Sequence, residues 1–251
     1  MTEQYLSGKR ALVTGAGQGM GTCHARALAA RGAFVVCADR TITPSLNELA
    51  AEINGTASGF DVCDADAARA AASPEATGPI DVLVLNHAYM SMGDFLDYDE
   101  DDWWRVVETN LTGTRNVLHA VLPGMPEGSR IVVISSEWGI TGWPEATAYA
   151  ASKSGLVSLV KTLARELAPR RIAVNALAPG VISTPQLQVD ASAAGVPLEE
   201  MIDRYASEIP ARRVGQPEEV AQAVALLADP TLGAMTGQTI QINGAALRCR
   251  V

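Results

Sequence analysis

Three residues in the middle of the chain have the types and spacing of an acid–base site. Tyr149 and Lys153 are four positions apart in TAYAASKSG, and Ser136 lies thirteen positions before Tyr149 at the end of an apolar run. Residues four apart lie on one face of a helix, so the phenol and the ammonium would be neighbours. A nearby positive charge favours phenolate and lowers the pKa of a tyrosine from its ordinary value of about 10. We expect Tyr149 to accept and donate a proton beside a hydroxyl that can hold a carbonyl.

A glycine-rich loop near the amino end has the form of a phosphate-binding turn. The strand-like run ALVTG leads into AGQGMG and a helical pattern, with the spacing TGxxxGxG and one additional glycine; these positions are Thr14, Gly15, Gly17, Gly19 and Gly21. Small residues let a backbone approach a pyrophosphate, whose charge is met by free N–H groups at a helix N-terminus. Glycines also form ordinary turns, but their place between the first strand and a helix favours a dinucleotide site.

An acidic residue follows at the end of the second strand-like run. Asp39 could accept hydrogen bonds from adenosine ribose hydroxyls and would repel a 2′-phosphate. An ordinary turn aspartate is one alternative, and the adjacent Arg40 could instead accommodate that phosphate. Because Asp39 comes first and lies where the strand ends, the sequence favours NAD(H) over NADP(H).

Composition and charge disfavour several classes of protein. The chain has 251 residues, of which 48% are hydrophobic and 19% charged, with a formal net charge of −9; these values favour a globular enzyme over a disordered chain. Its basic residues are scattered, so no cationic face for nucleic acid or a membrane is predicted. The start, MTEQYLSGKR, has no apolar leader, and no stretch approaches a membrane span. We therefore expect one cytoplasmic domain over residues 1–251 that acts on a small molecule.

The cysteines and histidines follow no metal-binding pattern. The cysteines show no CxxC or paired spacing: Cys23, Cys37, Cys63 and Cys249. The histidines form no ligand cluster with cysteines or carboxylates: His24, His87 and His119. Cys37 lies in an apolar run, where a reduced buried thiol is expected. A zinc-dependent hydride-transfer enzyme would need a ligand cluster, so we expect metal-free redox chemistry.

Short strand-like runs alternate with helical patterns, which is typical of a parallel sheet with helices on both faces. The predicted strands are 11–13, 34–38, 58–61, 82–85, 131–134, 173–177 and 239–242. The predicted helices are 20–30, 45–53, 102–122, 147–168 and 217–228. Residues 64–79 are interrupted by Pro74, so any helix there is limited to two or three turns. The order predicts a Rossmann-type, doubly wound α/β fold with seven parallel strands.

One long connection, residues 186–213, breaks this alternation and is predicted to be a substrate lid. After Pro197, five positions share one helical face: Leu198, Met201, Ile202, Tyr205 and Ile209. A small amphipathic helix there would either cap a cleft or simply pack on the body of the protein. The pattern alone leaves both interpretations open.

In order along the chain, these motifs resemble those of the short-chain dehydrogenase/reductase family, from about residue 7 to residue 244. TGAGQGMG matches the cofactor loop, and Asp61-Val62 matches the family's adenine-contacting pair. The catalytic set is matched by Asn110 in NLTG, by ISS ending at Ser136, and by the tyrosine and lysine described above. LNHA stands at residues 85–88 where the family usually has NNAG, and NALAPGVISTP and TGQTIQING match later segments.

The resemblance implies hydride transfer to and from nicotinamide C4. It makes Tyr149 the general acid/base, Lys153 the residue that holds the ribose and lowers the tyrosine pKa, and Ser136 the residue that orients the substrate oxygen. Asn110 would anchor a water that relays the proton, although a helix-bending role beside Gly113 is the alternative. The residues expected to bind NAD(H) are Gly15, Gly17, Gln18, Gly19, Met20, Gly21, Asp39, Arg40, Asp61, Val62, Asn86, Tyr149, Lys153, Pro179, Gly180, Ile182 and Thr184. The resemblance further implies a homotetramer that uses helices 102–122 and 147–168 at one interface.

The chain departs from the family pattern at several positions. Leu85 replaces the first asparagine of NNAG, while Asn86 matches the second. His87 is bulkier than the usual alanine and either hydrogen-bonds locally or touches the nicotinamide side. Gly244-Ala245 replaces a terminal Gly-Gly, which bears on the geometry of the last loop, and Arg212 stands where a small residue is more usual.

Substrate contacts are predicted around the catalytic serine. The candidates are Trp138, Trp143, Met90, Leu187 and Tyr89. They favour a fairly apolar, cyclic or steroid-like secondary alcohol and its ketone, although Trp143 fits a core or interface position equally well. A 3-oxoacyl carrier-protein reductase is the alternative activity, against which Asp39 and the acidic surface argue. A nucleotide-sensing regulator without turnover is the alternative of another class, and it would have no need of a general base.

Overall fold

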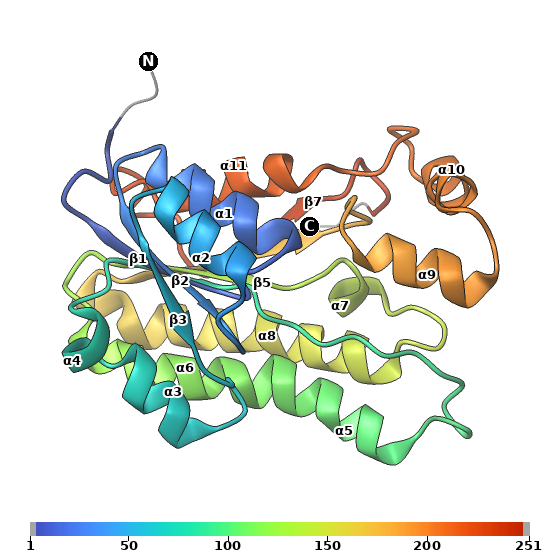
Figure 1. Ribbon diagram of the computed structural model, residues 1–251, viewed down its shortest axis with the longest axis horizontal. Coiled ribbons are helices and arrows are strands. Elements are labelled where there is room, and N and C mark those ends of the chain that lie inside the picture. Colours follow the sequence, from blue (N-terminus) through green and yellow to red (C-terminus); the bar gives the residue numbers. More distant parts are fainter. Residues whose placement is uncertain (1–3, 248–251) are drawn as a thin grey trace.

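Seven parallel strands form one sheet at the centre of the molecule (Figure 1). The computed structural model describes residues 4–247. The strands are β1 (Arg10–Thr14), β2 (Phe34–Asp39), β3 (Thr56–Gly59), β4 (Val82–Leu85), β5 (Arg130–Ile134), β6 (Ala173–Pro179) and β7 (Thr239–Ile242). Their order is β3-β2-β1-β4-β5-β6-β7, so after β3 the chain crosses to the other side of β1 and continues from β4. Ligands bind at such a switch point, outside the carboxyl ends of the strands, and the predicted doubly wound fold is confirmed.

Helices cover both faces of the sheet, and a smaller group stands beyond the carboxyl ends of the strands (Figure 1). One face carries α1 (Gly19–Ala29), α2 (Pro44–Glu52) and α11 (Pro217–Leu227). The other carries α3 (Ala65–Ala72), α5 (Glu100–Val107), α6 (Gly113–Val121) and α8 (Thr147–Leu167). The remaining short helices are α4 (Pro74–Thr77), α7 (Trp138–Thr141), α9 (Gln186–Ala194) and α10 (Leu198–Glu208).

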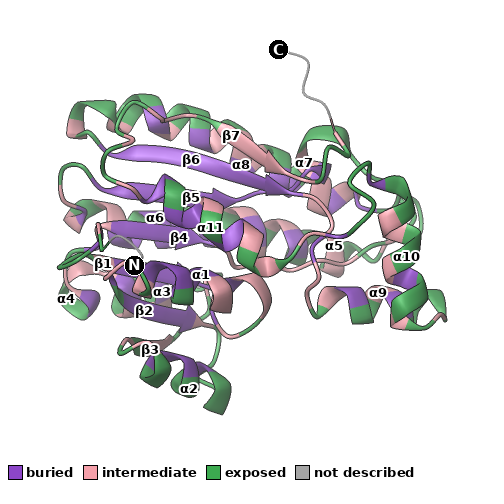
Figure 2. Ribbon diagram, turned by 90° about the horizontal axis from the view of Figure 1, so that it is seen from above, coloured by how far each residue is buried: buried purple, intermediate pink, exposed green. Residues whose placement is uncertain are grey.

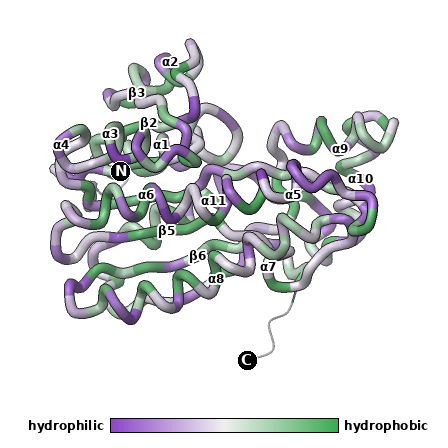
Figure 3. Tube along the Cα trace, turned by 90° about the horizontal axis from the view of Figure 1, so that it is seen from below, coloured by the Kyte–Doolittle hydropathy of each residue, from purple (hydrophilic) through white to green (hydrophobic). Residues whose placement is uncertain are grey.

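Two large apolar clusters form the main part of the core, one on each face of the sheet, and the central strands between them are buried (Figure 2). Successive side chains of a strand point to opposite faces, so Leu83 packs in the cluster that contains Leu156 of α8, while Val84 packs in the cluster that contains Leu28 of α1. Strands that are buried on both faces have continuous apolar sequences. β4 has the sequence VLVL, and β5 is mostly hydrophobic along its length (Figure 3). This rigid sheet fixes the loops at its carboxyl edge.

The strand predictions agree with the structure except at one edge. β4 and β7 have the predicted bounds, whereas β3 spans Thr56–Gly59 instead of 58–61. β3 pairs only with β2, from Val36↔Thr56 to Asp39↔Gly59, and its residues are only partly buried, so alternation gives no clear signal there. Phe60 and Asp61, assigned to the strand in the prediction, follow its end.

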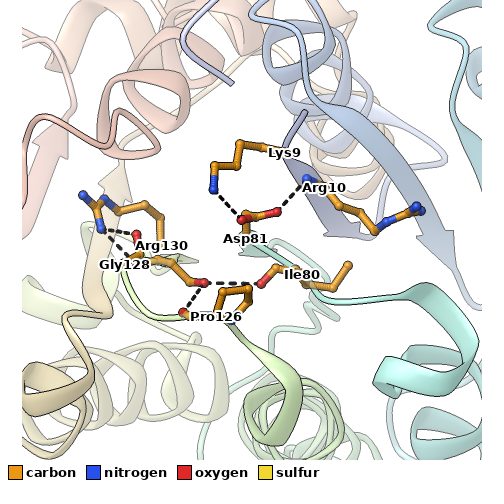
Figure 4. Close-up of polar contacts among 8 residues, drawn as sticks. Lys9, Arg10, Ile80, Asp81, Pro126, Gly128 and Arg130 are labelled. Carbon is orange, nitrogen blue, oxygen red and sulfur yellow. Dashed lines mark hydrogen bonds and ion pairs between the residues drawn. The ribbon is translucent and has the colours of Figure 1, made fainter. Parts of the chain in front are cut away.

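The amino ends of the central strands are tied together by a polar network (Figure 4). The Asp81 carboxylate accepts hydrogen bonds from the Lys9 ammonium at 2.9 Å and from the Arg10 backbone N–H at 2.9 Å. Nearby, an Arg130 guanidinium N–H donates to the Gly128 carbonyl at 2.6 Å. These contacts lie at the amino edge of the sheet, where the Asp81 carboxylate joins the segment before β4 to the start of β1.

The connection over residues 186–213 contains two helices. α10 has the predicted amphipathic face, with Met201 buried, while Ile209 lies just after the helix. α9 was missed because its apolar residues form no single stripe: Leu187 and Ala191 are buried but Val189 is exposed. Both helices stand beyond the carboxyl edge of the sheet (Figure 1). None of the helices in residues 4–247 is long and apolar enough to cross a membrane.

Candidate active site

The glycine-rich loop between β1 and α1 is built so that only glycine fits at its key positions. Gly15 and Gly19 have φ of +63° and +55°, a conformation that L side chains rarely adopt. A Cβ on Gly21 would lie 1.9 Å from the Gly15 carbonyl oxygen, and one on Gly17 would lie 2.8 Å from the Asp39 carboxylate. The loop therefore leaves its backbone open beside the N-terminus of α1, an arrangement that fits a dinucleotide pyrophosphate.

Asp39 is fixed at the carboxyl end of β2. Its carboxylate accepts hydrogen bonds from the backbone N–H groups of Gly17 at 2.9 Å and Arg40 at 2.7 Å. The side chain lines a groove of about 650 Å³ that follows the carboxyl edge of the sheet. A carboxylate held in this way remains an acceptor for ribose hydroxyls and a like charge to a phosphate.

The predicted cofactor residues divide between this groove and a neighbouring pocket. The groove is lined by Gly15, Gln18, Gly19, Met20, Asp39, Arg40, Asp61, Val62, Asn86 and Thr184. Gly17 and Gly21 belong to the loop itself and line neither space; a Cβ on Gly17 would meet Asp39, and one on Gly21 would meet the Gly15 carbonyl. The neighbouring pocket, of about 220 Å³, is lined by Tyr149, Pro179, Gly180 and Ile182. Met20, Ala88, Thr184 and Gln186 line both spaces, so groove and pocket adjoin.

Sequence reasoning missed several groove residues. Five of them lie beside predicted positions: Ala38, Phe60, Cys63, Ala88 and Pro185. Thr14, which begins the predicted glycine motif, also lines the groove. Arg105 and Thr109 come from α5 and the turn after it, and no motif indicated them. Tyr89, predicted near the substrate, lines the groove instead, with the Arg105 guanidinium 4.3 Å from its ring centroid.

The segment after β4 is locked onto the glycine loop by two side chains. The Asn86 amide donates to the carbonyls of Thr14 at 3.2 Å and Gly15 at 3.0 Å. His87 Nδ1 lies 2.7 Å from the Thr14 hydroxyl oxygen. Burial, followed by the Lys153 charge, lowers the pKa of His87 to about 3 and keeps its ring neutral. The local hydrogen bond considered for His87 is observed, and because the residue also lines the groove, its contact with the nicotinamide stays a prediction.

Ser136 and Tyr149 line the 220 Å³ pocket, and Lys153 lies behind them. Ser136 follows β5, while Tyr149 and Lys153 lie on the first turns of α8. The Lys153 side chain is 1% exposed, and its ammonium donates to the Ile134 carbonyl at 2.8 Å. The same nitrogen is 5.5 Å from the centroid of the Tyr149 ring. One helical turn thus brings the phenol and ammonium together, as the spacing predicts.

The expected lowering of the tyrosine pKa is wrong for the protein alone. Burial raises the pKa of Tyr149 to about 12, an effect that its hydrogen bond with Ser136 only partly opposes. Burial also lowers the pKa of Lys153 to about 8. Desolvation disfavours the charged form of both groups, so the phenol of the protein alone is a proton donor at neutral pH.

We expect this buried lysine to make the stability of the protein depend on pH. The pKa of Lys153 is about 8 in the folded chain and 10.5 ordinarily, so between these values the unfolded chain binds more protons. The free energy of unfolding should therefore rise with pH in this window and fall as pH drops through 8. Urea denaturation at pH 7.5 and 9.5 should show a rise of roughly 1–2 kcal/mol in wild type relative to Lys153→Met. An identical pH dependence in both proteins would contradict the assignment.

Asn110 lies in a π-helical turn, Glu108–Thr112, between α5 and α6. Its side chain is fully buried; the oxygen accepts from the Tyr89 N–H at 2.8 Å, and the amide donates to the Tyr89 carbonyl and the Ser152 hydroxyl at 3.0 Å each. The residue therefore fastens the segment after β4 to α8, close to Tyr149 and Lys153. Such π-turns are frequent at functional sites, and the helix distortion expected as the alternative role is present.

Trp138 forms the wall between two pockets. It packs edge-on against Tyr149, with ring centroids 6.0 Å apart, and stacks on Trp143 at 5.0 Å. Trp138, Met90 and Leu187 line the pocket of Ser136 and Tyr149, as predicted for substrate contacts. Trp143 is absent from that pocket's lining and lines a second pocket of about 300 Å³.

Comparison with known proteins identifies the family. Residues 15–245 match a family model described as Enoyl-(Acyl carrier protein) reductase. The chain is 38% identical over 250 residues to Oxidoreductase UcpA of Salmonella typhimurium, which covers 95% of this chain and 94% of the relative. It is also 38% identical over 248 residues to the 3-oxoacyl-[acyl-carrier-protein] reductase FabG of Thermotoga maritima, covering 95% of this chain and 98% of that protein. The chain belongs to the short-chain dehydrogenase/reductase family.

Structural comparison gives the same family. A short-chain glucose/ribitol dehydrogenase from Brucella melitensis superposes with a TM-score of 0.89 and 30% identity, over 99% of this chain and 100% of that chain. This protein is therefore an oxidoreductase of a family that generally uses NAD(P)(H) and acts on small molecules. Among the described residues no group of three or more His, Cys, Asp or Glu could hold a metal ion. Cys37 is a buried free thiol, as expected, and Cys249 lies outside the described residues.

Two departures from the short-chain dehydrogenase/reductase pattern have structural consequences. Ala245 stands where the family pattern has a glycine, and its φ is 70°. A glycine adopts this left-handed conformation without strain, whereas the Cβ of an alanine makes it unfavourable. Arg212 donates to the Ser207 carbonyl at 2.7 Å, while Arg213 forms an ion pair with Glu219 at 2.6 Å. Arg212 and Arg213 thus both hold the end of the lid connection, one through a backbone carbonyl and the other through α11.

Proposed function

We propose that this protein is an NAD(H)-dependent dehydrogenase that interconverts a secondary alcohol and its ketone. Nicotinamide cofactors supply or accept hydride at C4. The carbinol carbon of an alcohol in the pocket would exchange that hydride with a nicotinamide held on the groove side. Ser136 would hold the substrate oxygen, and the Tyr149 phenol would exchange a proton with it. The observation that carries the proposal is the position of Ser136 and Tyr149 on the wall of a pocket that adjoins the dinucleotide groove.

The proposal also covers the domain organisation, the assembly and the location of the protein. We treat residues 1–251 as one cofactor-binding and catalytic domain, with 186–213 as the lid, since Gln186, Leu187, Asp190 and Tyr205 of α9 and α10 line the pocket. A homotetramer is proposed from the resemblance, and the exposed Trp104 on α5 suits an interface there. We also propose a cytoplasmic location, from the composition of the sequence, and a water relay through Asn110, from the family resemblance.

A screen of secondary alcohols tests the proposal. Reduction of NAD⁺ would be followed for hydroxysteroids, cyclic alcohols, sugars and polyols, with the last two included because of the glucose/ribitol dehydrogenase relative. A 3-oxoacyl thioester with NADPH represents the activity named for the FabG relatives. Turnover of an alcohol with NAD⁺ supports the proposal, whereas turnover of the thioester alone, with NADPH, would replace it.

We expect Asp39 to set the choice of coenzyme. A 2′-phosphate placed beside its carboxylate meets a like charge, which costs several kcal/mol in a close contact. Asp39→Ala should therefore lower the ratio of kcat/KM for NAD to that for NADP by at least about tenfold. The matched control is Asp66→Ala, an exposed aspartate on α3, which should leave the ratio unchanged. Equal use of both coenzymes by wild type would show that Arg40 governs the site.

A further inference from the structure

The wall of the substrate pocket contains a buried carboxylate that no motif indicates. Glu137 directly follows Ser136 and is 9% exposed. Its backbone N–H donates to the Pro179 carbonyl at 2.9 Å, which fixes the residue between the ends of β5 and β6. Its Oε2 atom is buried and has no hydrogen-bond partner among the described residues.

Within the described residues, the two pockets that Glu137 lines contain no positively charged side chain. Glu137 lines both the 220 Å³ pocket of Tyr149 and the 300 Å³ pocket behind Trp138, and neither lining contains Lys, Arg or His. Close to Oε2 lies the Gly180 backbone, where an added Cβ would be 3.0 Å away. Burial raises the pKa of Glu137, and the Asn243 amide opposes that effect only in part.

The second carboxylate of the pocket is already engaged. Asp190 on α9 accepts from the Gln186 amide at 2.9 Å and from the Tyr205 hydroxyl at 3.3 Å. These bonds hold the two lid helices together, so Asp190 has a structural explanation. The Oε2 atom of Glu137 accepts no such hydrogen bond from the described residues. A buried acceptor without a partner lowers the stability of a folded protein, and such atoms are rare.

We propose that Glu137 binds a hydrogen-bond donor of the substrate other than the reacting hydroxyl. The donor is a second hydroxyl or an ammonium group, located where the two pockets share Glu137 and Trp138. This inference rests on the proposed dehydrogenase function and defines its substrate class as diols, hydroxyketones or amino alcohols rather than purely apolar alcohols. A site built to bond a substrate O–H or N–H rejects the analogue that lacks it, because its own polar group is then left unpaired.

The test uses matched secondary alcohols that differ at one remote position, which carries hydroxyl, ammonium, methyl or carboxylate. Wild type should prefer the hydroxyl or ammonium compound to the methyl compound by at least tenfold in kcat/KM. In Glu137→Gln and Glu137→Met that preference should fall at least tenfold, because the hydroxyl or ammonium compound loses kcat/KM, mainly through KM, and the methyl compound does not. Glu199→Gln, the same chemical change on the exposed face of α10, should alter none of these values.

Each outcome decides the proposal. If wild type prefers either the hydroxyl or the ammonium compound to the methyl compound in kcat/KM, the proposal is supported, and the better of the two identifies the donor. An equal loss for all compounds in both Glu137 variants would show a purely structural role, and preference for methyl or carboxylate in wild type would overturn it.

Binding measurements separate this inference from the proposed function. If no alcohol in the set is oxidised, the dehydrogenase proposal fails, and calorimetric titration of the same compounds into NADH-loaded protein still compares their affinities. Tighter binding of the hydroxyl or ammonium compound, lost in Glu137→Gln, would support the donor site by itself. Equal affinities for hydroxyl, ammonium and methyl compounds would reject it.

Discussion

Tyr149→Phe should lower kcat/KM for alcohol oxidation by about 10²–10⁴-fold, the usual contribution of general acid–base catalysis. The substitution removes only the phenolic oxygen, while the ring keeps its edge-on contact with Trp138. NADH affinity should change little, because the glycine loop and Asp39 that define the groove are untouched. The loss should therefore appear in turnover and not in cofactor binding.

The matched control is Tyr98→Phe. The Tyr98 hydroxyl is buried without a hydrogen-bond partner among the described residues, and it lies outside the lining of the groove and both pockets, so its removal should leave activity unchanged. In wild type, oxidation should become faster as pH rises, because the pKa of Tyr149 is about 12 and deprotonation supplies the base. Wild-type turnover in Tyr149→Phe would end its assignment as the acid/base.

The sequence predicted the fold and most of the site because both depend on local patterns. Buried strands such as β4 read as continuous apolar runs, and the glycine loop, Asp39 and the Tyr149–Lys153 spacing each carry their chemistry within a few residues. In a doubly wound sheet, the ends of the strands converge on one edge. Once the fold class is predicted, motifs at the ends of the strands are therefore expected to lie close together.

The remaining features depend on tertiary surroundings. The direction of the Tyr149 pKa follows from desolvation of a buried phenol, which spacing alone does not reveal. Glu137 belongs to no sequence motif. It is singled out only because its Oε2 atom is buried beside the pocket without a hydrogen-bond partner among the described residues. α9 lacks a clear apolar stripe and is held by contacts with α10, such as the bond from Tyr205 to Asp190.

Gly21→Ala should weaken NADH binding at least tenfold and lower the free energy of unfolding. The new methyl group would lie 1.9 Å from the Gly15 carbonyl oxygen and 2.8 Å from the Asn86 amide nitrogen. Neither can move freely, because the Asn86 amide donates to that carbonyl at 3.0 Å. Overpacking of this kind costs about 1–3 kcal/mol, and each 1.4 kcal/mol that falls on binding is about tenfold in affinity.

Gly155→Ala is the matched control for this change. Gly155 lies within α8, and a Cβ there would be 3.4 Å from the Leu111 methyl groups, an ordinary contact. Replacing a helical glycine by alanine should stabilise the protein by roughly 0.5–1 kcal/mol and leave NADH affinity unchanged. Fluorescence titration with NADH and urea denaturation measure both effects. If Gly21→Ala binds NADH as wild type does, the loop yields more readily than its contacts indicate, and the close approach of Gly21 to Gly15 is not what shapes the cofactor site.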